Sequence, residues 1–176
     1  MSALYPYLLS RMAEVPLTDR LSTASASGNL HELLLLLENG ADVNGLNTFG
    51  RTPLQVVKLS CDHVIQALLE AGANPDVRDP VCGLTVTHDA ARDGWIDAVR
   101  LLIDHKADPN MVDDRGNLPL HLAASRGHLR VVQLLMGHTQ NPHTRNNEGR
   151  TAALEALFHG KMDTAKYIDE YLNPAH

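Results

Sequence analysis

The sequence predicts an all-α solenoid of about five helix-turn-helix repeats, and three observations carry this prediction. Glycines recur 33 residues apart, at positions 50, 83, 116 and 149. A short helical pattern follows each of these glycines, with a capping Thr before it in three of the four copies, and a second apolar helical pattern comes after that. A fixed period of this length is typical of stacked units, none of which can bury its apolar face alone.

The first helix of each repeat is predicted from the residues after the glycine. Residues 50–54 read Gly-Arg-Thr-Pro-Leu, and residues 116–124 read Gly-Asn-Leu-Pro-Leu-His-Leu-Ala-Ala. Thr52 can cap a helix, and Pro53 suits the first helical position, where a missing N–H costs nothing. These strings resemble the ankyrin repeat. The resemblance implies an ankyrin-repeat solenoid with hairpin-like tips between successive helix pairs.

A second helix is expected in each repeat because apolar residues recur there at helical spacing. Glycine suits the left-handed end of such a helix, but the third repeat has Lys106 at this place. We therefore expect local backbone strain at Lys106. The expected second helices cover residues 33–38, 64–70, 96–104, 129–136 and 164–171.

The predicted domain organisation is an ankyrin-repeat domain over residues 19–172 after an N-terminal extension, residues 1–18. The extension has no repeat counterpart and does not follow the pattern of a signal peptide. The first unit lacks its leading turn, and terminal units are expected to be atypical because their outer faces meet water. The predicted repeats cover about 19–47, 48–80, 81–113, 114–146 and 147–172.

The composition excludes several classes of partner. A net charge of −6 and the lack of a basic stripe argue against nucleic acid and anionic membranes. No apolar run approaches the roughly 20 residues that a bilayer requires. Cys61 and Cys82 have no metal-ligand spacing, and no Asn-x-Ser/Thr sequon occurs. We expect a soluble monomer in the cytoplasm and nucleus, where thiols stay reduced.

Ten histidines raise the alternatives of a metal site and of proton transfer. His88 and His121 occupy the repeat position at which an imidazole ties the helix start to the preceding turn, which favours a structural role. No histidine has zinc-ligand spacing. The pair Gly160-Lys161 does not complete a phosphate loop, and no Gly-x-Ser-x-Gly elbow exists. We expect no enzyme activity, no metal and no cofactor.

Two departures distinguish this array from a generic one. The interval from Thr52 to Ala73 takes 22 residues, where the common pattern takes 23, which predicts that the first helix of the second repeat shrinks to a single turn. An extra residue in segment 79–82 restores the period. An acidic residue, Asp89, directly follows the structural histidine at position 88.

Together with segments 47–51 and 127–132, these departures resemble the ankyrin-repeat inhibitors of the cyclin-D-dependent kinases, over residues 19 to about 168. The resemblance implies binding beside the nucleotide cleft of the kinase, with hindered cyclin binding and ATP alignment and restrained progression from G1 to S. Carried over by position, it implies an interface of eight residues: Phe49, Val57, Lys58, Asp79, Asp89, Arg92, Trp95 and Asp97.

Alternatives stay open at three points. Asp89 either pairs with an arginine of the kinase or is an intramolecular partner of Arg92. Trp95 is either a binding anchor or a cover for the edge of the core. The whole chain is alternatively a generic ankyrin adaptor for another signalling or transcription protein, since fold does not fix function.

Overall fold

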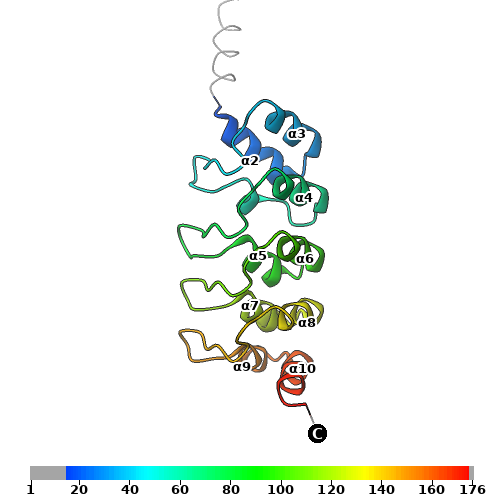
Figure 1. The fold of residues 1–176 in the computed structure, drawn as a ribbon. Coiled ribbons are helices and arrows are strands. Elements are labelled where there is room, and N and C mark those ends of the chain that lie inside the picture. Colours follow the sequence, from blue (N-terminus) through cyan, green and yellow to red (C-terminus); the bar gives the residue numbers. More distant parts are fainter. Residues whose placement is uncertain (1–14, 175–176) are drawn as a thin grey trace, which may run out of the picture.

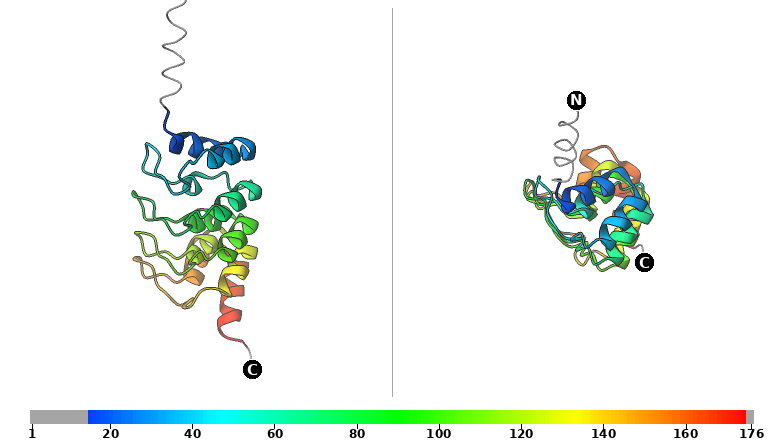
Figure 2. Two further views of the ribbon diagram at one scale, coloured as in Figure 1. Left: turned by 45° about the horizontal axis from the view of Figure 1, so that its top comes forward. Right: turned by 90° about the horizontal axis from the view of Figure 1, so that it is seen from above.

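The computed structural model describes residues 15–174, so most of the predicted N-terminal extension lies outside the described residues. Helix pairs stack along one axis, and hairpin-like tips project from one side of the stack (Figure 1). Seen along that axis, successive pairs overlie one another (Figure 2). The described part contains no strand, which confirms the all-α repeat fold.

The elements follow the predicted order. In each pair the first helix lies beside the tips and the second lies on the far side (Figure 1). The first pair begins inside the segment that the sequence assigns to the N-terminal extension. The elements are α2 (Leu17–Ser27), α3 (Leu30–Glu38), the 3-10 helix η1 (Leu54–Val56), α4 (Asp62–Glu70), α5 (Val86–Asp93), α6 (Ile96–Asp104), α7 (Pro119–Arg126), α8 (Leu129–Met136), α9 (Ala152–Phe158) and α10 (Met162–Leu172).

Aliphatic side chains and alanines fill the space between the layers. Large residues such as Leu68 and Leu120 are fully buried, and each contributes about 1.5 to 3 kcal/mol by leaving water. The pair Ala123 and Ala124 is equally inaccessible and lets α7 approach its neighbours closely. The core is therefore continuous along the stack, with no repeat burying its apolar face alone.

Glycines end α2, α5 and α7 in the left-handed conformation and also make room for the next repeat. Gly127 follows α7 with φ of 78°. A Cβ atom there would lie 2.9 Å from Cδ of Lys161, so the lysine stem rests directly on this glycine. A Cβ atom at Gly94 would likewise lie 2.7 Å from Nδ1 of His128. A side chain at either position would strain the backbone and separate the layers.

The second repeat has the predicted short first helix. The Thr52 N–H donates to Oε1 of Gln55 (2.9 Å), and the Gln55 N–H donates to Oγ1 of Thr52 (3.3 Å). Only three residues then form η1, and Val57 leaves the helix with ψ of 142°. The chain continues along α2, where the Lys58 N–H donates to the carbonyl of Ser25 (3.1 Å). This segment replaces the second turn of the helix.

The extra residue predicted in the third tip is accommodated within the turn itself. The Gly83 N–H donates to the carbonyl of Asp79, four residues earlier, at 2.9 Å. In the second tip the Gly50 N–H donates to Asn47, only three residues earlier, at the same distance. The insertion enlarges one turn and leaves the helices on either side in register.

Lys106 follows α6 with φ of 71° and is the one non-glycine residue with positive φ in the part of the chain that the structure describes. The left-handed backbone conformation of this helix end is thus kept at Lys106, and the predicted strain is confirmed.

The buried histidines are structural, and each also connects to the following repeat. Nδ1 of His88 accepts the Thr85 N–H (3.1 Å), while Nε2 lies 2.9 Å from the carbonyl of Asn117, in the following repeat. His121 accepts the Leu118 N–H in the same way. The bond to the segment before the helix agrees with the predicted role, and the bond from Nε2 to the following hairpin is an additional link that the stacking of repeats provides. Burial lowers the pKa of both imidazoles.

Candidate protein-binding surface

A groove opens beside η1 because this single turn leaves space that a full helix would fill. It has a volume of about 430 Å³ and is bounded by the second and third repeats. We call it the η1–α5 groove. Four of the eight predicted interface residues line it: Val57, Asp79, Asp89 and Arg92.

Asp89 lies on α5 and opens onto this groove. Its carboxylate is 31% exposed and forms an ion pair with Nη2 of Arg92 (2.8 Å), one helical turn later. Nε of Arg92 lies 3.0 Å from Asp93, so one guanidinium faces two carboxylates. Burial raises the pKa of Asp89, although the arginine opposes this shift. The intramolecular alternative for Asp89 is thus present, in a side chain that still faces outward.

Asp79 is held mainly by its own turn. Its carboxylate accepts N–H bonds from Val81 (2.8 Å) and Cys82 (3.2 Å) and pairs with Arg51 of the second repeat (2.7 Å). Burial would raise the pKa of Asp79, but these N–H bonds and the Arg51 charge outweigh it, so the pKa is lowered. Asp79 therefore fixes the tip and the rim of the groove.

The other predicted contacts of the second repeat lie in different environments. Phe49 is 81% exposed at the tip of its hairpin. Lys58 is exposed on the segment that follows η1. Val57 is only 7% exposed and belongs to the core, since it packs where the missing helical turn would stand. Its expected role as a surface contact is corrected to that of a groove wall.

Trp95 and Asp97 are not part of the groove lining. Trp95 is the residue before α6 and is 42% exposed. Asp97 is exposed in the first turn of α6, where its charge suits the positive end of the helix dipole. The groove lining therefore includes four of the eight predicted residues and leaves the other four outside it.

Val81 is a surface residue that the sequence reading missed. It is 80% exposed at the third tip, next in the stack after the tip that carries Phe49. The inserted residue in this turn could have predicted the exposure of Val81, because an enlarged turn directs an additional side chain into solvent. Exposed apolar residues on adjacent tips are typical of contact surfaces.

Within 15–174, no group of three or more His, Cys, Asp or Glu side chains is arranged to hold a metal ion. Over the same span, no helix has the length and apolar character required to cross a membrane.

Comparison with known proteins gives two results. The family model described as "Ankyrin repeats (3 copies)" matches residues 21–113, 57–146 and 88–173. Cyclin-dependent kinase 4 inhibitor B of Mus musculus is 42% identical over 103 residues, which cover 58% of this chain and 79% of that protein. Cyclin-dependent kinase inhibitor 2A of Homo sapiens is 40% identical over 108 residues, which cover 61% of this chain and 69% of that protein.

Proposed function

This chain belongs to the ankyrin-repeat family of cyclin-dependent kinase inhibitors, and on this premise we propose that it binds and inhibits a cyclin-D-dependent kinase. The inhibitor occupies the surface beside the nucleotide cleft, hinders cyclin binding and ATP alignment, and thereby restrains progression from G1 to S. It acts as a monomer in the cytoplasm and nucleus, and its contacts are with protein rather than nucleic acid or membrane.

The observation that carries this proposal is the acidic, preorganised wall of the η1–α5 groove. Arg92 holds Asp89 in place, and with Asp93 the three side chains keep a net negative charge. A cationic side chain of the kinase can therefore be received without reordering the inhibitor. Preorganisation of this kind reduces the entropy lost on binding.

The exposed apolar tips supply the second part of the interface. Phe49 and Val81 project from the tips of adjacent repeats. Aromatic and aliphatic side chains in such positions become buried on association and often dominate the binding energy. The partner is thus expected to combine a basic group with an apolar surface.

The deciding experiment is the Asp89→Asn variant. Truncating one partner of a desolvated charge pair costs about 2 to 5 kcal/mol, so the affinity for the kinase should fall by more than tenfold. Affinity is measured by calorimetry with the cyclin-free kinase, alongside inhibition of the cyclin complex. Asp104→Asn is the matched control, since Asp104 is exposed at the end of α6, outside the groove lining.

Both variants should retain the thermal midpoint and circular dichroism of the parent. Unchanged kinase affinity in Asp89→Asn would remove the groove from the interface. A parent protein that binds no cyclin-D-dependent kinase would instead favour an adaptor for another protein.

A further inference from the structure

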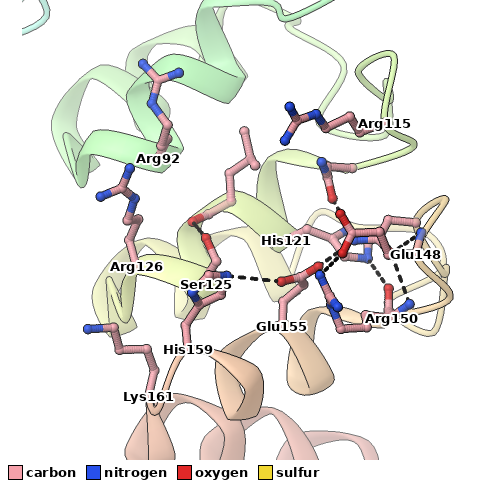
Figure 3. A pocket seen from close by; sticks show the side chains of 13 residues that line it. Arg92, Arg115, His121, Ser125, Arg126, Glu148, Arg150, Glu155, His159 and Lys161 are labelled. Carbon is pink, nitrogen blue, oxygen red and sulfur yellow. Dashed lines mark hydrogen bonds and ion pairs between the residues drawn. The ribbon is translucent and has the colours of Figure 1, made fainter.

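A second cleft lies farther along the stack, across the third to fifth repeats (Figure 3). It has a volume of about 530 Å³. Arg92 lines both this cleft and the η1–α5 groove. We call it the basic cleft, because five cationic side chains line it: Arg92, Arg115, Arg126, Arg150 and Lys161.

Two carboxylates also line the basic cleft, and both are already engaged. Nε of Arg150 lies 2.9 Å from Glu155, and the same guanidinium pairs with Glu148. Glu155 is buried, and although burial would raise its pKa, the Arg150 charge and the Asn146 amide lower it overall. This arginine and its two carboxylates therefore form a closed set within the cleft.

Three cations in the lining have no such partner. The side chains of Arg115, Arg126 and Lys161 are exposed, and none makes an ion pair or hydrogen bond to any residue within 15–174. The local excess of positive charge contrasts with the net charge of −6 of the whole chain. Unpaired cations gathered in a cleft create a potential that attracts anions.

The positions of these cations are set by the fold. Arg126 is the last residue of α7, and the stem of Lys161 is supported by Gly127. Arg92, Arg126 and Lys161 follow one another along one side of the cleft, while Arg115 and Arg150 lie on the other side (Figure 3). An anion between the two sides would face cations from consecutive repeats.

We propose that the basic cleft binds an acidic segment of a protein partner, that is, a short run of Asp and Glu side chains. The occupant is extended, because the cations are distributed over three repeats rather than gathered at one point. Asp89 does not line this cleft, and the three unpaired cations Arg115, Arg126 and Lys161 lie outside the proposed kinase contact.

The lining favours a protein segment over nucleic acid. It contains no Phe, Tyr or Trp on which a base could stack, and stacking is a main source of affinity for single strands. Glu148 is 55% exposed at the rim and would repel a continuous phosphate backbone. A peptide with spaced carboxylates can avoid this residue and still reach the cations.

The test measures the fluorescence anisotropy of a labelled peptide with six Glu residues interspersed with Gly and Ser, titrated with the full chain. Binding is expected at 50 mM salt and should be largely lost at 300 mM, because exposed charges are screened. The double variant Arg126→Gln/Lys161→Gln should weaken binding about fivefold or more, given typical energies of exposed ion pairs.

The matched control is Arg100→Gln/Arg130→Gln, which makes the same change in net charge. Both arginines are exposed on second helices, α6 and α8, outside the cleft lining. The control variant should bind the peptide like the parent. Equal weakening by the control variant would show that binding depends only on the net charge of the protein, and this result would overturn the proposed site.

Two further probes complete the test. A peptide with Lys in place of Glu should not bind, and equal binding would contradict a charge-selective cleft. An oligothymidine of comparable charge should compete poorly. If it binds more tightly than the acidic peptide, the protein-segment proposal is wrong and the cleft is a nucleic-acid site.

Discussion

The second and fourth repeats join their neighbours in the same way, although their first helices differ greatly. In the second repeat, η1 has three residues, whereas α7 of the fourth repeat has eight. Each of these elements nevertheless carries a side chain that links the start of its own helix to the next hairpin. The comparison shows that the connection between repeats depends on this bridging side chain and not on the length of the helix.

The bridging residue is Gln55 in the short repeat and His121 in the full one. Oε1 of Gln55 accepts the Thr52 N–H, and its Nε2 donates to the Val77 carbonyl (3.1 Å). His121 accepts an N–H through Nδ1, and its Nε2 lies 3.0 Å from the Thr144 carbonyl. A neutral imidazole and a primary amide each offer an acceptor atom and a donor atom that can bond to two different groups. Gln55 thus reproduces the histidine bridge without a titratable group.

The largest effect is expected from removing the bridge in the full repeat. His121→Ala leaves a buried N–H and a buried carbonyl without partners and opens a cavity, so the free energy of unfolding should fall by about 3 kcal/mol. Gln55→Ala should lower it by about 1 to 2 kcal/mol, since Gln55 is half-buried. Urea denaturation measures both, with the exposed His143→Ala as control. A larger loss for Gln55→Ala would reverse the comparison.

Hydrogen exchange should distinguish the two repeats next. Residues 54–60 have one helical turn and one chain segment laid along α2, whereas residues 119–126 have a full helix packed on both sides. We expect amide protons of the second repeat to exchange about tenfold faster, because local opening there disrupts fewer buried contacts. Mass spectrometry or NMR can follow both segments in one sample. Slower exchange in the second repeat would contradict the prediction.

The pH dependence of stability should separate the histidine bridge from the glutamine bridge. Burial lowers the pKa of His121 below the unfolded value of about 6.5. The unfolded chain therefore binds more protons below that pH, and stability present above it is lost as the pH falls. His121→Gln should flatten this decline between pH 7.5 and 5, as measured by urea denaturation. An unchanged slope, with His143→Gln as reference, would show that the bridge does not contribute.

The smallest effect concerns the helix end that uses lysine. Lys106→Gly should raise the free energy of unfolding by roughly 0.5 to 1 kcal/mol, since relief of left-handed strain outweighs the added freedom of the unfolded chain. Lys106→Ala keeps the strain and should change stability little. A gain in the alanine variant alone would assign the effect to the lysine charge.

Much of the fold could be predicted from the sequence because the repeat imposes one solution on every unit. The glycine period located the helix pairs, the one-residue deletion after Thr52 predicted η1, and the glycine position taken by Lys106 predicted a strained helix end. The outward position of Asp89 was also anticipated. These features depend on spacing within one repeat, which a single sequence displays directly.

The features that escaped prediction depend on contacts between repeats. The second bond of His88 reaches Asn117 in the next layer, and the basic cleft collects residues from three layers. Val57 was expected on the surface, but the shortened helix draws it into the core. Such outcomes follow from how neighbouring layers fit, and periodicity alone does not contain that information.

The enlarged turn at residues 79–83 has a wider consequence. Its added residue is absorbed by a single hydrogen bond between Gly83 and Asp79, so the layers above and below keep their spacing. The length of one hairpin tip can therefore vary without disturbing the neighbouring repeats. Evolution can thereby change which partners bind to this surface by lengthening a single tip, while the packing of the core stays the same.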